Sequence, residues 1–138
     1  MNLLHLSGRK TCDYILRKGT LWRGKTMNIR WMPGVPPNTR KQLKEQAPQG
    51  PYLGTFAPLS LSKRAVDRNR MRRRCREALR ISMRDEQEFP SVQLLLSPRS
   101  SSLSCDFQDI LRDVRLFLSS LRTCLSNHAS ATPSSNSR

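Results

Sequence analysis

Residues 62–80 read SKRAVDRNRMRRRCREALR, the most basic stretch of a chain of 138 residues. Within this stretch, small and apolar side chains recur at helical spacing, at Met71, Cys75, Ala78 and Leu79. Arginines fill most positions between them, so the pattern predicts an amphipathic helix over 65–84 with an arginine-rich polar face. A guanidinium stays charged and offers a planar fork of donors that matches phosphate oxygens, so such a helix suits a sugar-phosphate backbone.

Three segments outside this helix have the pattern of β-strands. Residues 26–32 alternate strictly between apolar and polar side chains, which is the period of a half-buried strand. Residues 91–97 are more continuously apolar, so we expect this strand to be the more central one. Residues 52–62 predict a further strand, in which Pro58 removes a hydrogen-bond donor and implies an edge position or a bulge.

A short helix is predicted over residues 11–18, before the first strand. Thr11 is its expected N-cap, and Gly19 is expected to form a left-handed turn at its end. Its core-facing side chains are expected to be Cys12, Ile15 and Leu16.

The last helix has the most regular apolar period of the chain, from Phe107 to Leu121. Ser104 is its expected N-cap. Because charged residues of an amphipathic helix normally face solvent, three carboxylates are expected on its outer face: Asp106, Asp109 and Asp113.

Two segments lack any regular pattern. Residues 33–51 contain five prolines and two glycines, which predicts an exposed inserted loop. Residues 126–138 are rich in serine and too polar to bury a core, which predicts a disordered tail. The remaining length and apolar content suffice for one domain, over residues 1–125.

The charge of the chain is concentrated in one part of the sequence. The formal net charge is +15, but residues 1–84 carry +16 and residues 85–138 carry −1. A charge needed only for solubility would be scattered, so this asymmetry indicates one specialised face with a polyanionic partner. Nucleic acid is the first candidate partner, and an anionic membrane surface is the second.

Neither export nor membrane insertion is expected. No apolar run approaches the roughly 20 residues that span a bilayer, and residues 1–10 lack a signal-peptide core, so we expect a cytoplasmic protein. The four cysteines are widely spaced and form no Cys-x-x-Cys motif, which favours free thiols over a disulfide or metal site: Cys12, Cys75, Cys105 and Cys124.

The arginine-rich helix has two alternative interpretations. It could be a solvated helix face, but Glu77 is the only acid that offsets the arginines in its middle. It could also lie on a membrane surface, but its apolar side offers Cys, Ala and Ser where a membrane anchor needs Trp, Phe and Leu. An RNA-binding helix remains the favoured interpretation.

One motif within this stretch is more specific than its charge. Residues 59–64 read LSLSKR, and from Ser62 to Glu77 the pattern is S-x-x-A-x-x-R-N-R-M-R-R-x-C-R-E. In this spacing the sequence resembles the protein subunit of bacterial ribonuclease P. The short helix, the strand near 92–96 and the last helix follow in the family's order, so the resemblance covers about residues 9–122.

The resemblance implies an α+β fold. It is a small two-layer α/β sandwich, in which a mixed sheet of about four strands packs against about three helices. The Arg-Asn-Arg helix would lie in a left-handed βαβ crossover, which runs against the usual handedness of such connections.

The resemblance also implies a function. In that family the protein binds a large catalytic RNA, and the ribonucleoprotein is an endoribonuclease that removes the 5′ leader from precursor tRNA. The RNA and its bound Mg²⁺ carry the hydrolysis, so the protein alone would not be catalytic. The implied partners are the catalytic RNA and precursor tRNA, with no membrane and no obligate protein partner.

Site residues follow from the same resemblance. The residues implied to contact the catalytic RNA are Lys63, Arg64, Arg68, Asn69, Arg70, Arg72, Arg73, Arg76 and Arg80. The family's cleft for the single-stranded leader is lined by aromatic side chains and the sheet face, and the candidates here are Tyr14, Phe56 and Ser60.

The residues themselves offer the protein alone no catalytic site. The acids at 85–88 are typical of a solvated helix end, and His5 and His128 lie near the termini. Zinc-ligand spacing and a glycine-rich phosphate loop are both absent from the sequence. The main alternative function is therefore that of a structural, ribosomal-type RNA-binding protein with no role in processing.

Overall fold

The computed structural model describes residues 3–6, 8–36, 50–84, 86 and 89–136. In chain order they form β1 (Leu4–His5), α1 (Arg9–Lys18), β2 (Thr20–Arg23), β3 (Met27–Pro33), β4 (Pro51–Thr55), α3 (Ala65–Arg84), β5 (Val92–Pro98), the 3₁₀ helix η1 (Ser100–Leu103) and α4 (Phe107–Asn136). The fold is α+β, and its strands form one mixed sheet in the order β1-β4-β5-β3-β2. α3 connects the parallel neighbours β4 and β5, so the predicted βαβ crossover is present.

β5 is the middle strand of the sheet, as its continuous apolar sequence predicts. It pairs with β4 on one side and with β3 on the other. Leu94 and Leu96 belong to the main core, whereas Leu95 points to a smaller core on the opposite face. Because both faces of β5 are buried, its sequence cannot alternate between apolar and polar side chains.

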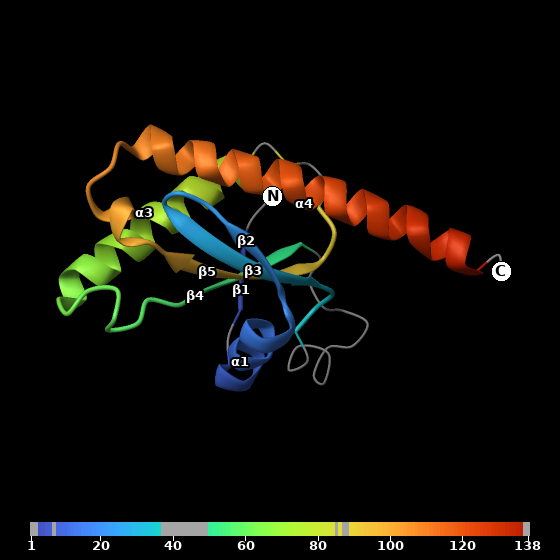
Figure 1. The fold of residues 1–138 in the computed structure, drawn as a ribbon, viewed down its shortest axis with the longest axis horizontal. Helices are drawn as coiled ribbons and strands as arrows, with labels where there is room; N and C mark the ends of the chain where they lie inside the picture. Colours follow the sequence, from blue (N-terminus) through green and yellow to red (C-terminus); the bar gives the residue numbers. More distant parts are fainter. Residues whose placement is uncertain (1–2, 7, 37–49, 85, 87–88, 137–138) are drawn as a thin grey trace.

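α3 and α4 cover one face of the sheet side by side (Figure 1). The predicted apolar side of α3 is buried, and its bounds agree with the predicted helix over 65–84. From β3, Met27 and Ile29 enter the same core, which confirms the alternation read from residues 26–32. Trp22 of β2 packs edge-to-face on Phe117 of α4, with 5.4 Å between the ring centroids.

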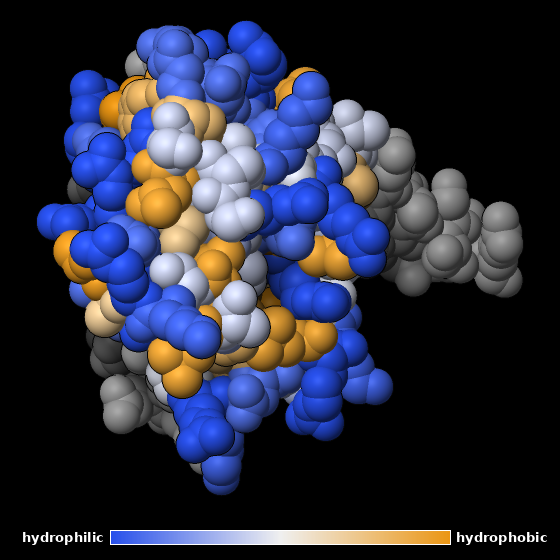
Figure 2. All heavy atoms as spheres, turned by 60° about the vertical axis from the view of Figure 1, so that its left-hand side comes forward, coloured by the Kyte–Doolittle hydropathy of each residue, from blue (hydrophilic) through white to orange (hydrophobic). Residues whose placement is uncertain are grey.

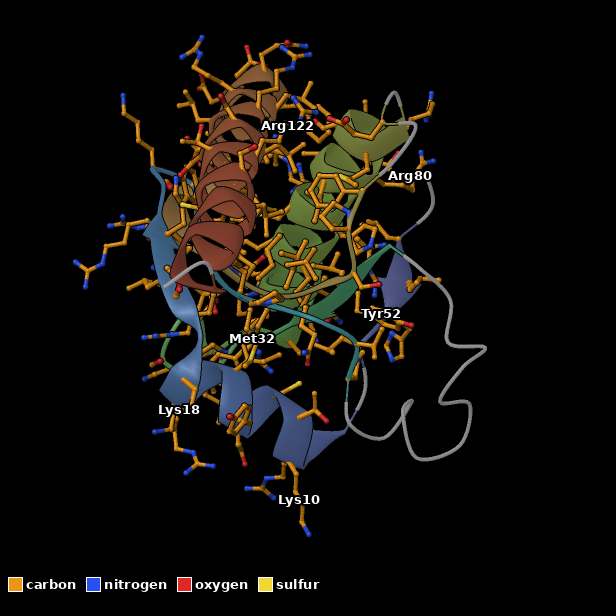
Figure 3. All side chains as sticks on the ribbon, turned by 90° about the vertical axis from the view of Figure 1, so that its right-hand side faces the viewer. Lys10, Lys18, Met32, Tyr52, Arg80 and Arg122 are labelled. Carbon is orange, nitrogen blue, oxygen red and sulfur yellow. The ribbon has the colours of Figure 1, made fainter. Side chains whose placement is uncertain are left out.

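α1 lies on the opposite face and covers one end of it. Ile15 is fully buried there against Leu6, Tyr52 and Leu95, while Cys12 and Leu16 pack around them as predicted. Figure 3 shows α1 on the other side of the sheet from α3 and α4, with Lys10 and Lys18 pointing away from the sheet. The other end of this face is left without a helix (Figure 1).

The strand predicted over residues 52–62 is too long. β4 ends at Thr55, and the last strand-like contact is a hydrogen bond of 2.9 Å from the Phe56 N–H to the Leu96 carbonyl. Pro58 then begins a turn that closes when the Leu61 N–H donates to its carbonyl at 3.0 Å. Pro58 therefore lies in the turn after β4, not at an edge position or a bulge within the strand.

Sequence analysis missed two strands, β1 and β2. They contain two and four residues, which is too short for a period of alternating side chains to be recognised. Together with the three strands predicted from the residues they make a sheet of five, where the resemblance implies about four.

Three predicted helix-end features are also wrong. Thr11 lies inside α1 and is buried, since the helix begins two residues earlier, after Gly8. Gly19 has an extended backbone with φ of −71°, not a left-handed one. It is needed for space, because a Cβ there would lie 2.6 Å from the Ile15 carbonyl oxygen. At α4 the cap is Asp106 and not Ser104: its Oδ1 accepts from the Gln108 N–H at 3.1 Å.

The two segments without a regular sequence pattern, residues 33–51 and 126–138, are described by the structure to different extents. The backbone of α4 continues to Asn136, so residues 126–136 are helical where the sequence predicts a disordered tail. Intrahelical hydrogen bonds let a formed helix propagate beyond Leu121, the last buried side chain among those that the structure describes. In the predicted loop over 33–51, Pro33 ends β3 and Pro51 begins β4, while residues 37–49 lie outside the described part of the chain.

Asp113 is buried, which corrects its predicted place on the outer face of the last helix. Only 4% of the residue is exposed, and its Oδ2 accepts two hydrogen bonds from Thr26. The Thr26 N–H donates at 2.6 Å and the Thr26 hydroxyl at 2.7 Å. One carboxylate thus ties α4 to the turn between β2 and β3, 87 residues earlier in the chain.

We expect Asp113→Ala to lower the free energy of unfolding by about 2 kcal/mol, because both Thr26 donors would lose their charged acceptor in a buried site. Asp109→Ala is the matched control, since this partly exposed carboxylate pairs with the exposed Arg112 at 3.5 Å, and its loss should cost less than about 1 kcal/mol. Urea unfolding followed by circular dichroism measures both variants. Equal losses would contradict the anchoring role of Asp113.

Burial raises the pKa of the Cys75 thiol to about 12. This thiol therefore stays neutral and unreactive at pH 8, whereas Cys124 is exposed. We expect a thiol-labelling reagent at pH 8 to modify Cys124 in the folded protein and Cys75 only after denaturation, as read by mass spectrometry. Labelling of Cys75 at the rate of Cys124 would show that the α3 side of the core opens readily.

Candidate nucleic-acid interface

The outer face of α3 surrounds a hollow of about 470 Å³. Four predicted RNA-contacting residues lie together around it, Asn69, Arg72, Arg73 and Arg76. Thr55 at the end of β4 and Val66 complete its lining. Figure 2 shows the side of the molecule where α3 begins, on which hydrophilic side chains surround small apolar patches. Because these α3 positions are three or four residues apart, one helix face presents them all.

The basic side chains of this face differ in how they are held. Arg72 donates to the Asn69 side-chain oxygen, and Arg80 pairs with Glu77. The hydrogen bond from Arg80 lowers the pKa of the Glu77 carboxyl, so this pair remains ionised at neutral pH. Arg73 and Arg76 have no hydrogen bond or ion pair within the part of the chain that the structure describes. Their guanidinium groups are therefore the ones most available to an anionic ligand.

Other predicted contact residues are held by the protein itself. Arg68 donates to the Ser62 carbonyl at 2.7 Å, and Arg70 donates to the Leu103 carbonyl at 3.4 Å. Arg64 faces Asp67 at 3.8 Å, and Lys63 is exposed in the connection before α3. These four basic residues do not line the hollow around Arg73.

The uncovered end of the sheet forms a second concave surface of about 430 Å³, here called the sheet-face cleft. It is lined by Leu16, Leu21, Arg23, Asn28, Arg30, Phe56, Ser97 and Arg99. Arginine can bind phosphate groups, and an exposed aromatic ring can stack on a base. Phe56 supplies such a ring, with 43% of the residue exposed.

Asn28 contributes a polar atom that the described part of the protein does not satisfy. Its Oδ1 is buried and has no hydrogen-bond partner there. A buried carbonyl oxygen without a partner is costly, and here it belongs to a residue that also lines the cleft.

The three predicted leader-binding residues have different outcomes. Phe56 lines the sheet-face cleft. Tyr14 is exposed on α1, and Ser60 is exposed in the turn after β4, but neither is among the residues that line the cleft. The structure thus brings one of the three to this surface.

Sequence analysis did not select the arginines of the cleft. Arg30 had a usable signal, because it alternates with the buried Ile29 on β3. Arg23 and Arg99 had none, since their positions depend on the short strand β2 and on the turn after β5.

The linings of the two concave surfaces include consecutive residues at the end of β4. Thr55 lines the α3 hollow, and the next residue, Phe56, lines the sheet-face cleft. A polyanion could therefore contact α3 and enter the cleft without leaving the protein surface.

Two further searches concern other functions. Among the described residues, no three His, Cys, Asp or Glu side chains lie close enough together to hold a metal ion. In the same part of the chain, no helix is long and apolar enough to cross a membrane.

Comparison with known proteins identifies the family of this chain. The family model of ribonuclease P matches residues 2–122. The ribonuclease P protein component of Cyanothece sp. is 28% identical in an alignment 117 residues long that covers 80% of this chain and 88% of the relative. That of Thermus thermophilus is 30% identical over 112 residues, which are 81% of this chain and 56% of the relative.

Solved structures show the same fold. The RNase P protein of Staphylococcus aureus has a TM-score of 0.61 at 16% identity, covering 83% of this chain and 92% of that one. The RNase P protein of Thermotoga maritima has a TM-score of 0.60 at 15% identity, covering 83% of this chain and 94% of that one. Since the family model matches nearly the whole described domain, this chain belongs to the ribonuclease P protein family.

Proposed function

We propose that this chain is the protein subunit of a ribonuclease P ribonucleoprotein. It would bind the catalytic RNA and the 5′ leader of precursor tRNA, and assist removal of the leader to give the mature 5′ end. The observation that carries this proposal is the junction at Thr55 and Phe56, where an arginine-lined hollow meets a cleft with an aromatic ring. One surface suits a structured RNA backbone, and the other suits a single strand.

The catalytic RNA would bind the outer face of α3. Arg73 and Arg76 supply guanidinium groups that no described residue pairs with, and Asn69 and Arg72 line the same hollow. Each phosphate neutralised by a basic side chain releases a counterion, so this binding must weaken as salt rises. The remaining basic residues of the motif, including Lys63, Arg64 and Arg80, extend the positive surface around this centre.

The 5′ leader would lie in the sheet-face cleft. Phe56 can stack on a base whatever its identity, and the arginines of the cleft can pair with phosphates. Asn28 also lines this cleft and carries a side-chain amide, a group that can hydrogen-bond to a base or a ribose hydroxyl. A cleft of this kind supports the processing role over that of a structural RNA-binding protein, which would need only the α3 surface.

The protein's part in the reaction would be positional. Its residues would hold the RNA and the leader, while Mg²⁺ bound mainly by the RNA would supply the metal-assisted hydrolysis. The proposed location is the cytoplasm, with catalytic RNA and precursor tRNA as partners and no obligate protein partner.

At low Mg²⁺, we expect this protein to raise leader cleavage by a bacterial ribonuclease P RNA above the rate of the RNA alone, because it adds contacts to the leader. Gel analysis of a 5′-labelled precursor tRNA measures the rate. No stimulation, together with equal affinity for an unrelated structured RNA, would favour the structural RNA-binding alternative.

We expect Arg73→Gln combined with Arg76→Gln to reduce the slope of log affinity against log salt by roughly two units for the catalytic RNA, because two phosphate contacts are lost. The matched control is Arg112→Gln with Arg115→Gln, which removes the same charge from the exposed side of α4. Filter binding over a series of salt concentrations provides the slopes. An unchanged slope for the α3 variant, or an equal change for the control, would show that this hollow does not touch phosphate.

A further inference from the structure

Arg74 lies inside the arginine-rich helix but does not line the hollow on its outer face. Its side chain is partly buried and points to the segment after β5. Nη1 donates to the Ser102 carbonyl and Nη2 to the Cys105 carbonyl, each at 2.6 Å. One guanidinium thus bridges two main-chain oxygens that are three residues apart.

Hydrogen bonds through Ser102 link Arg74 to Arg99. The residue is fully buried, and both of its donors reach the Arg99 carbonyl, the N–H at 2.9 Å and the hydroxyl at 2.7 Å. The 3₁₀ turn between them is therefore fixed from inside the protein by Arg74.

Arg99 is also held from the side of the sheet. Its N–H donates to the Thr26 carbonyl at 2.9 Å, and its Nη1 donates to the Gly24 carbonyl at 2.9 Å. Thr26 is itself anchored by the buried Asp113. These bonds place the Arg99 side chain in the wall of the sheet-face cleft. Because a guanidinium has five N–H donors, the bond to Gly24 leaves others for a ligand.

We infer that Arg74 is a positioning residue for the cleft: through Ser102 it sets Arg99 where its guanidinium binds a phosphate of a single-stranded RNA. This inference rests on the proposed function and deepens it. The role of Arg74 differs from that of its neighbours on α3. Arg73 and Arg76 face outward, whereas the guanidinium of Arg74 donates to two main-chain carbonyls. A planar fork is needed for that bridge, and a lysine ammonium cannot reproduce its geometry.

The test uses the full protein reconstituted with a bacterial ribonuclease P RNA. Affinity is measured for two precursor tRNAs, one with a leader of about ten nucleotides and one with a leader of a single nucleotide. The ratio of the two affinities is the leader-dependent gain. The variants are Arg74→Gln, Arg74→Lys, Arg99→Gln and the double variant Arg74→Gln with Arg99→Gln, with Arg73→Gln for comparison.

We expect Arg74→Gln and Arg99→Gln each to reduce the leader-dependent gain by roughly tenfold, the effect of one lost charge-assisted hydrogen bond to phosphate. The double variant should lose no more than Arg99→Gln alone, because both changes remove the same contact. Arg74→Gln should leave the salt slope for the catalytic RNA unchanged, whereas Arg73→Gln should lower it by about one unit. Arg74→Lys keeps the charge and should still lose part of the gain.

Three outcomes would overturn the inference. In the first, Arg74→Gln lowers the salt slope as Arg73→Gln does, which would make Arg74 a direct RNA contact. In the second, the losses from Arg74→Gln and Arg99→Gln are additive. In the third, Arg74→Lys keeps the full gain, so that charge alone matters; this variant also decides the question if Arg74→Gln does not fold. A wild-type protein without any leader-dependent gain would instead overturn the proposed function, and the inference with it.

Discussion

Burial of one side of α3 holds the most strongly charged helix of the protein in place. Arginines three and four residues apart repel one another, and only Glu77 pairs with one of them in the middle of the helix. Against this repulsion, five side chains of α3 are buried at 1% exposure or less: Met71, Cys75, Ala78, Leu79 and Met83. Each of the larger ones contributes about 1.5–3 kcal/mol by leaving water. The core therefore fixes which face of the helix presents its arginines.

The long, regular elements could be predicted from the sequence because their patterns repeat over many residues. α3 and the start of α4 show a helical period over several turns, and the apolar run of β5 marks a strand buried on both faces. Strands of two and four residues leave no such period, so β1 and β2 were missed. Pro58 could be recognised as a residue that disturbs strand pairing. The end of β4 could not be read from it, because that end depends on where β5 still offers a hydrogen-bond partner.

Asp113 and the sheet-face cleft show a different limit of prediction. Asp113 is three residues after Ile110 and four before Phe117, so its spacing placed it on the buried side of α4 while its charge indicated the surface. Spacing was the better guide, because Thr26 supplies two donors that no local pattern reveals. The α3 hollow was largely predictable from one contiguous motif. The cleft draws its arginines from β2, β3 and the turn after β5, which only the fold brings together.

The junction between the two concave surfaces has a consequence for self-association. Among the described residues, β1 pairs with β4 at Tyr52 and Leu53, and this ladder does not extend to Thr55 at the end of that strand. An open strand edge invites pairing with another copy of the same protein. At this point, however, Thr55 shares its surroundings with Arg72, Arg73 and Arg76. A second copy approaching edge to edge would bring like charges together, so the arginines that line the hollow disfavour strand pairing between two copies at this edge.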